Sequence, residues 1–161
     1  MDLRAATLDD AEALCDIYNP YVETTTVTFE LRPRTLAEER EWLQTHLGVY
    51  PVVVATEGDE VVGFASLSPW RERPAYKTSA EDSVYVHRGR HGQGLGSLLL
   101  GEVVRRGAEH GFHTLLARIV GGHEASIAIH RKHGFDIVGT EREVGRKFNR
   151  WLDVVVMQRL L

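Results

Sequence analysis

The segment that decides the fold runs from Val84 to Leu100 and reads Val-Tyr-Val-His-Arg-Gly-Arg-His-Gly-Gln-Gly-Leu-Gly-Ser-Leu-Leu-Leu. Its β-branched and aromatic start predicts a strand over residues 83–87, and its leucines open a helix expected over 95–110. The glycines between them lack side chains, so a ligand can approach the backbone closely. The unpaired N–H groups that begin a helix suit a pyrophosphate. The segment therefore predicts a strand, a candidate phosphate loop and a helix.

Two well-known nucleotide loops fit this segment poorly. A mononucleotide P-loop has Gly-Lys-Ser/Thr at the helix start, and Gly96-Ser97-Leu98 lacks the lysine. A dinucleotide fingerprint has a glycine directly after the strand, whereas residues 87–90 intervene here, and Leu99 stands where its third glycine belongs. The glycine spacing alone leaves a ligand loop and an ordinary glycine turn equally open.

The flanking sequence predicts alternating strands and helices. Thr7 and Thr35 each precede an acidic residue by three positions, which is typical of a capped helix start. The state of residues 24–31 stays open. Strands are expected at 3–6, 51–56, 61–67, 83–87, 114–120, 136–144 and 152–160, and helices at 7–20, 35–48, 95–110 and 125–133. This order favours a single α/β domain over residues 1–161, with a mixed twisted sheet and helices on both faces.

Composition narrows the class of protein. The chain has 161 residues, of which 43% are hydrophobic and 26% charged, as in an ordinary globular domain. Its net charge of −4 argues against nucleic-acid binding driven by bulk charge. The lone Cys15 lies in an amphipathic stretch and predicts a small buried side chain in a reducing compartment. Neither a signal-peptide core nor an apolar run of membrane length is present, so we expect a cytoplasmic protein without a membrane partner.

Taken with motifs elsewhere, the glycine segment resembles the coenzyme A loop of the GCN5-related N-acetyltransferase (GNAT) superfamily. That loop reads Arg/Gln-x-x-Gly-x-Gly/Ala; Gly94 and Gly96 match it, and His91 departs from it at the first position. Further pieces resemble the phosphinothricin and methionine sulfoximine acetyltransferase branch, in the right order and over nearly the whole chain. They are Asp16-Ile-Tyr-Asn19 with Thr26-Val-Thr-Phe29, Glu81-Asp-Ser-Val-Tyr-Val86, Ser126-Ile-Ala-Ile-His130 with Gly134-Phe135, and Val144-Gly-Arg-Lys-Phe-Asn-Arg-Trp-Leu-Asp153.

The resemblance implies acetyl-coenzyme A as donor, direct transfer within a ternary complex, a small amino-acid-like amine as acceptor, and a homodimer. A backbone N–H near Val86 would stabilise the oxyanion of the tetrahedral intermediate. His123 stands where related sequences carry Asn. The expected coenzyme contacts are Val84, Tyr85, Val86, Arg88, His91, Gly92, Gln93, Gly94, Leu95, Gly96, Ser97, His123 and Ser126.

Two titratable residues are the predicted catalytic groups. Glu81, expected at the start of its strand, matches the general base proposed for the branch. Its neighbour Asp82 should face the opposite way and therefore away from the site. His130 stands where this branch has a histidine that could protonate the departing thiolate, although a core-edge histidine explains it equally well.

The acceptor pocket is expected from the N-terminal and central loops and from the C-terminal hairpin. An amino-acid carboxylate needs cationic partners, for which solvated loop charge is the competing explanation. The predicted set is Phe29, Arg71, Arg73, Pro74, Ala75, Tyr76 and Lys147. The histidines show no metal-ligand spacing, so no metal is expected. Two other functions stay open: a peptide N-terminal acetyltransferase, and a coenzyme A-binding module without turnover.

Overall fold

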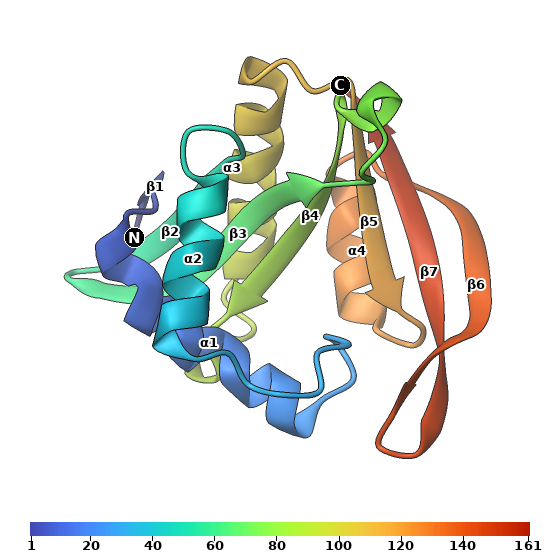
Figure 1. The fold of residues 1–161 in the computed structure, drawn as a ribbon, viewed down its shortest axis with the longest axis horizontal. Coiled ribbons are helices and arrows are strands. Elements are labelled where there is room, and N and C mark those ends of the chain that lie inside the picture. The colour runs from blue at the N-terminus through green and yellow to red at the C-terminus, as the bar shows by residue number, and fades with distance from the viewer.

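One seven-stranded sheet, in the order β1-β2-β3-β4-β5-β7-β6, organises the computed structural model, which describes residues 1–161 (Figure 1). All neighbouring strands are antiparallel except β4 and β5, which are parallel. The sheet is therefore mixed, as predicted. The strands are β1 (Asp2–Ala5), β2 (Val52–Glu57), β3 (Glu60–Pro69), β4 (Ser79–Val86), β5 (Thr114–Val120), β6 (Asp136–Lys147) and β7 (Arg150–Leu160).

Two helices cover each face of the sheet. Helices α1 (Ala11–Thr24) and α2 (Leu36–His46) lie in front of it in Figure 1, and α3 (Leu95–Glu109) and α4 (Glu124–Lys132) lie behind it. The cap predicted at Thr35 is present, since its hydroxyl accepts the Glu38 N–H at 3.1 Å. The α/β class, the element order and the helices on both faces are thus confirmed.

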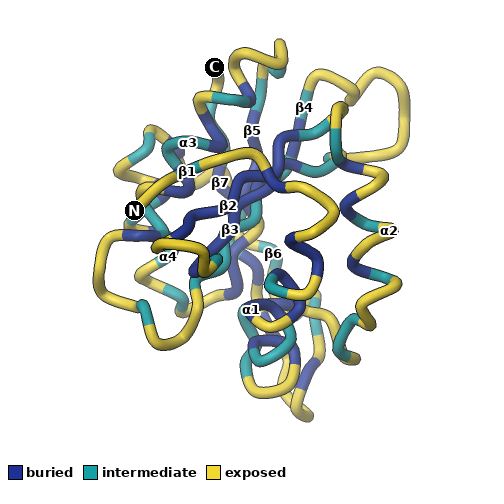
Figure 2. Tube along the Cα trace, turned by 90° about the vertical axis from the view of Figure 1, so that its left-hand side faces the viewer, coloured by how far each residue is buried: buried dark blue, intermediate teal, exposed yellow.

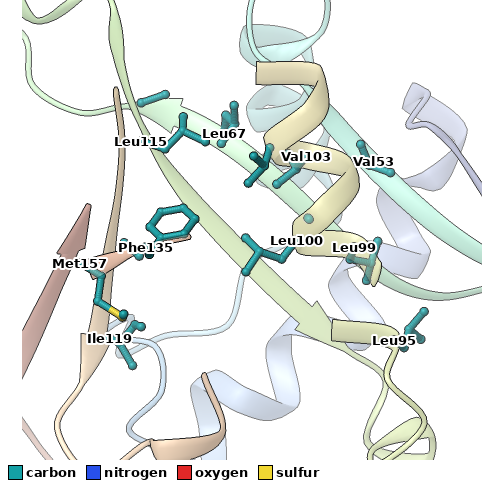
Figure 3. Packing of buried hydrophobic residues seen from close by; sticks show 14 of the residues in the cluster. Val53, Leu67, Leu95, Leu99, Leu100, Val103, Leu115, Ile119, Phe135 and Met157 are labelled. Carbon is teal, nitrogen blue, oxygen red and sulfur yellow. The ribbon is translucent and has the colours of Figure 1, made fainter. Parts of the chain in front are cut away.

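Each helical layer has its own hydrophobic core. On the α3 side, Leu95, Leu99, Leu100 and Val103 pack against the sheet together with residues such as Phe135 and Met157 (Figure 3). On the other side, one face of α1 and Leu43 of α2 pack on β2 and β3. Figure 2 shows the result: the inner strands, β2, β3 and β5 above all, are largely buried, whereas the edge strands β1 and β6 and the outer helix faces are mostly exposed. Cys15 lies in the second layer as a free, buried thiol.

Helix α1 runs past Pro20, where the sequence predicted its end. Proline removes one N–H from the helix ladder, so a stop was the simpler expectation. Tyr21 and Val22, both buried, anchor the additional turn on the sheet, and the Thr24 hydroxyl donates to the Pro20 carbonyl at 2.7 Å. Burial therefore outweighs the lost backbone hydrogen bond.

Other boundaries differ because pairing extends strands beyond their apolar pattern. Strand β4 begins at Ser79, four residues before the predicted start, since residues 79–81 pair with β5 and residues 80–81 also pair with β3. The final hairpin turns at Phe148 and Asn149, both at positive φ, so its strands are longer than expected. Residues 25–35, partly left open by the sequence, form the loop between α1 and α2. No helix combines the length and hydropathy that a membrane span requires.

Candidate active site

The site begins where β4 and β5 separate. Their parallel pairing covers only Ser79–Glu81 opposite Thr114–Leu116, and beyond this fork the strands diverge (Figure 1). A cavity of ≈620 Å³ opens between them, bounded by both strands, by the glycine loop and by the first turns of α4. The unpaired edge of β4 along this cavity leaves backbone groups available to an extended ligand.

The glycine loop forms one end of this cavity. Gly92 and Gly94 each have φ +77°, a conformation that favours glycine, and a Cβ built on either meets no atom within 4 Å. Helix α3 begins at Leu95, so its first N–H groups have no partner inside the helix. Open space beside unpaired donors and a helix dipole fits a pyrophosphate. Gly92, Gly94, Leu95, Gly96 and Ser97 all line the cavity, and their contact with coenzyme A stays a prediction.

The basic residues of the loop are arranged differently from the prediction. Arg88 and Gln93 do not line the cavity. Arg88 donates to the Pro20 carbonyl at 2.8 Å and to the Thr24 hydroxyl, so it closes the end of α1 onto the loop. Arg90 does line the cavity, but it is paired with Glu57 and, at 3.7 Å, with Glu60.

His91 is held by a residue that sequence reasoning did not single out. The Tyr21 hydroxyl donates to the Val86 carbonyl, so it must accept from His91 Nε2, 2.6 Å away. This network ties α1, β4 and the glycine loop together beside the cavity. His123 and Ser126, at the start of α4, line the same cavity with Val84, Tyr85 and Val86.

Glu81 is the third residue of β4 rather than its start, and it is half-buried. It faces the α1 side of the sheet with Ser83 and Tyr85, although its own side chain lines neither cavity. Burial raises the pKa of Glu81 to about 7, against the opposing charge of Arg118 and with support from Asp82. A carboxyl that titrates near neutrality suits a general base.

The expectation that Asp82 points away from the site is wrong. Side chains do alternate along β4, but at the fork the cavity reaches both faces of the strand, so Asp82 lines it as well as Ser83 and Tyr85 from the face of Glu81. Its Oδ1 lies 2.8 Å from Nε2 of His130, and both side chains are almost fully buried. Burial alone would lower the pKa of His130, but the Asp82 carboxylate and the Ser126 carbonyl outweigh it and raise that pKa.

A second cavity of ≈380 Å³ lies on the α1 side of the sheet. It shares Ser83 and Tyr85 with the first, so the two cavities meet beside these residues on the α1 side of β4. Arg34 is the one cation in its lining, held over the Tyr18 ring at 4.4 Å and 3.2 Å from the buried Glu39 carboxylate. The other lining residues are Tyr18, Thr28, Phe29, Glu30, Trp42, Phe64, Ser66 and Ser68.

Of the predicted acceptor residues, Phe29 alone lines this second cavity. Arg71, Arg73, Pro74, Ala75 and Tyr76 are exposed and line neither cavity. Arg71 lies over the Trp70 ring at 4.7 Å, although its charge does act on the pKa of Glu81. These residues belong to the loop between β3 and β4. The composition of that loop did not indicate that it lies outside both cavities.

Lys147 is buried and donates to the Thr28 carbonyl at 2.9 Å. It therefore holds the loop 25–35 on the β6–β7 hairpin instead of facing a cavity. Phe29 packs so closely on Gly145 that a Cβ there would overlap its ring. Gly145 and Lys147, which both belong to the Val144–Asp153 motif, thus contact the same loop, residues 25–35.

Arg34, Tyr21 and Asp82 are the residues that sequence reasoning missed as site candidates. Arg34 is one of several loop arginines, and nothing in its local pattern distinguishes it. Tyr21 follows Pro20, where the helix was expected to stop. Asp82 was set aside on strand alternation alone. No group of three His, Cys, Asp or Glu side chains is arranged to hold a metal.

The chain resembles known acetyltransferases over nearly its whole length. The family described as an acetyltransferase (GNAT) domain matches residues 3–156. The chain is 43% identical to a phosphinothricin N-acetyltransferase of Streptomyces coelicolor, covering 100% of this chain and 96% of that protein. It is 39% identical to an L-methionine sulfoximine/L-methionine sulfone acetyltransferase of Pseudomonas aeruginosa, covering 97% and 92%.

Solved structures agree with these relatives in fold. A phosphinothricin acetyltransferase from Sinorhizobium meliloti, in complex with acetyl-CoA, superposes with a TM-score of 0.96 at 40% identity, covering 99% of this chain and 88% of that chain. A protein described as a ribosomal-protein-alanine N-acetyltransferase, from Brucella melitensis, superposes with a TM-score of 0.98 at 40% identity, covering 100% of both. These relatives thus share one fold, whereas their descriptions name two kinds of acceptor: small amino-acid-like compounds and a ribosomal protein.

Proposed function

Because this chain belongs to the acetyltransferase (GNAT) family and is an acetyl-coenzyme A-dependent N-acetyltransferase, we propose that its acceptor is the α-amino group of a small amino acid. Methionine sulfone, methionine sulfoximine and phosphinothricin are the first candidates, because they are the substrates named for the relatives. The observation that carries the proposal is the pair of cavities meeting at Ser83 and Tyr85.

The two cavities divide the reaction between donor and acceptor. The ≈620 Å³ cavity accommodates the donor, with its pyrophosphate at the glycine loop and its pantetheine arm along the free edge of β4. The ≈380 Å³ cavity has the size of an amino acid and places its one cation, Arg34, to meet an anionic group. Glu81, on the same face as Ser83 and Tyr85, takes the proton that keeps the amine from attacking.

Thiol release from acetyl-coenzyme A tests this proposal. The acceptors are free methionine sulfone, methionine sulfoximine and phosphinothricin, set beside a short peptide and an amine without a carboxylate. We expect free amino acids to give the highest kcat/KM. Release with none of the acceptors would leave a coenzyme A-binding protein without turnover and would overturn the proposal.

The role of Arg34 has its own test. Arg34→Gln combined with Glu39→Gln removes the cation and its buried partner together, so no buried charge is stranded. The acceptor KM should rise by about tenfold or more, as for a lost charge-assisted hydrogen bond. Coenzyme A affinity should stay unchanged. Arg40→Gln, an exposed change on α2, is the matched control; equal KM values in both variants would exclude Arg34 as an anchor.

A peptide N-terminus is the second candidate acceptor, favoured by the description of the Brucella melitensis structure. In the same panel, a higher kcat/KM for the peptide than for methionine sulfone would select this function. A larger ligand would need an open groove, whereas the loop 25–35, which Lys147 holds on the β6–β7 hairpin, bounds one side of the acceptor cavity. This boundary supports the free amino acid.

We also propose that the enzyme works as a cytoplasmic homodimer. A free, buried Cys15 suits a reducing compartment. Exposed apolar side chains on the β6–β7 hairpin, among them Val138, Val144 and Trp151, support contact with a second copy. Neither nucleic acid nor membrane enters this proposal. Sedimentation of the purified protein at two concentrations tests the dimer.

A further inference from the structure

The pair formed by Asp82 and His130 lines the donor cavity where β4 and β5 separate. Asp82 is the first residue of β4 after the last pair with β5, so it lies directly at the fork. His130 comes from the last turn of α4. Their 2.8 Å contact therefore joins β4 to the helix that follows β5, across the point where the two strands separate. With the pyrophosphate at the glycine loop, the pantetheine arm runs along β4 toward this pair.

The hydrogen bonds of the pair fix where protons lie. His130 Nδ1 is 2.7 Å from the Ser126 carbonyl, which can only accept, so Nδ1 carries a hydrogen. Nε2 faces the Asp82 carboxyl. The other carboxyl oxygen, Oδ2, is buried and has no partner, so His130 alone balances any charge on Asp82. A desolvated carboxylate in this position favours a doubly protonated imidazole beside it.

We propose that Asp82 is the positioning residue of His130, and that the pair holds a proton at the fork for the coenzyme A sulfur. The inference rests on the proposed acetyl transfer. As the amine nitrogen bonds to the acetyl carbon, the carbon–sulfur bond breaks and the sulfur takes one proton from the Asp82–His130 pair. The acceptor nitrogen loses two protons overall: one passes through Glu81 to solvent, and the other, lost once the new bond has formed, restores the proton of the pair.

The surroundings leave Asp82 as the group that sets the charge of His130. Asp82 is the one acid among the residues that line the cavity. His123 and His133 cap the two ends of α4, and the cavity is also lined by Arg90, His91 and Arg118, all of which oppose a positive imidazole. The other nearby acid, Glu81, lines neither cavity, although its pKa responds to the charge of Asp82. Phe135 contacts the ring edge-on at 5.0 Å and excludes water from that side.

Asp82→Asn tests the proposal, because it keeps the shape of the side chain and removes its charge. The falling, alkaline limb of the kcat–pH profile reports loss of the His130 proton, and it should move at least about one unit toward lower pH. The coenzyme A Kd should stay within about threefold, since a factor of three is less than 1 kcal/mol. Asp136→Asn, an exposed acid at the start of β6, is the matched control. A profile unchanged from wild type would overturn the proposal.

Ring nitrogen NMR of the wild-type protein with coenzyme A bound gives a second readout that needs no acceptor and no variant. We expect both ring nitrogens of His130 to be protonated at pH 7, and a neutral ring would overturn the proposal. In a His130→Gln background, Asp82→Asn should leave the pH profile where His130→Gln alone puts it; a further shift would mean that Asp82 acts by another route. If wild type acetylates no amine, the proposed function fails, whereas the NMR result still decides the charge of the pair.

Discussion

At the scale of single residues, burial gives Glu81 the pKa that our proposed base requires. Its carboxyl lies on a central strand with little water around it, so its charged form is costly, and its pKa rises to about 7. The same burial that lets Glu81 exchange protons near neutrality works against folding once the group is ionised. Activity and stability are therefore coupled at this one side chain.

Glu81→Gln tests the contribution of this carboxyl to turnover. Glutamine keeps the size and polarity but cannot take a proton, so kcat should fall by roughly 10²–10⁴-fold. Wild-type kcat should rise with pH through about 7, and this limb should be absent in the variant. Steady-state kinetics between pH 5.5 and 9, a range of about ±2 units around that value, measure both. Normal turnover at neutral pH would place the base elsewhere.

The same variant should be more stable than wild type at high pH. The folded pKa of Glu81 lies above its ordinary value of 4.5, so its contribution is fully present below that value and is lost as pH rises through about 7. At pH 8 the variant should gain about 1–3 kcal/mol in free energy of unfolding, and near pH 4.5 the difference should vanish. Urea denaturation at the two pH values gives the comparison, and an equal difference at both would contradict the burial effect.

At the scale of elements, the glycines of the loop before and within α3 have different tasks. Gly92 and Gly94 are needed for their left-handed backbone, so a side chain there strains the loop whatever the ligand does. Gly96 has an ordinary helical backbone, and its Cβ would lie 3.6 Å from Ile129 and 3.9 Å from Val86, inside the donor cavity. Only Gly96 therefore isolates the ligand contact from backbone strain.

Gly96→Val should block the donor without unfolding the domain. Its branched side chain fills the space between β4 and α4, so coenzyme A affinity should fall by at least about tenfold, or 1.4 kcal/mol. Valine also has a higher helix propensity than glycine, which limits any loss of stability. Calorimetry measures the affinity, with Gly139→Val on β6, where a Cβ meets nothing within 4 Å, as control. Wild-type affinity in a folded Gly96→Val protein would exclude this path for the pantetheine arm.

At the scale of the whole molecule, the acceptor cavity depends on a contact between distant parts of the chain. Lys147 and Thr28 are 119 positions apart, and their hydrogen bond fastens the loop after α1 to the C-terminal hairpin. Burial lowers the pKa of Lys147, against the opposing charge of Glu30. A buried ammonium is retained here because it holds the loop that carries Phe29 and Arg34 around the cavity.

Lys147→Met should loosen this junction while it keeps the apolar stem. The acceptor KM should rise by about three- to tenfold, the value of one net hydrogen bond, with coenzyme A affinity unchanged. Kinetics with varied acceptor and calorimetry with coenzyme A make the two measurements, and Lys132→Met, exposed at the end of α4, is the control. An equal loss of donor and acceptor affinity would mean that Lys147 supports the fold in general.

The sequence by itself determined the architecture and the donor loop, because both depend on local chemistry. Periodicity and caps predicted the order of strands and helices, and the glycines between Val86 and Leu95 could be read as a phosphate loop once further motifs stood beside them. Glu81 and His130 could be predicted as catalytic groups for the same reason, since they lie within contiguous motifs.

The tertiary structure alone decided which side chains meet. Asp82 and His130 are 48 positions apart, and only the fork between β4 and β5 brings them together. Arg34 reaches the acceptor cavity whereas Arg71 and Arg73 do not, because loop arginines look alike until the fold sets their direction. Pro20 lies inside α1 because burial of Tyr21 and Val22 exceeds the cost of one missing hydrogen bond. Packing free energy comes from contacts between residues far apart in the sequence, so no single stretch of the chain predicts it.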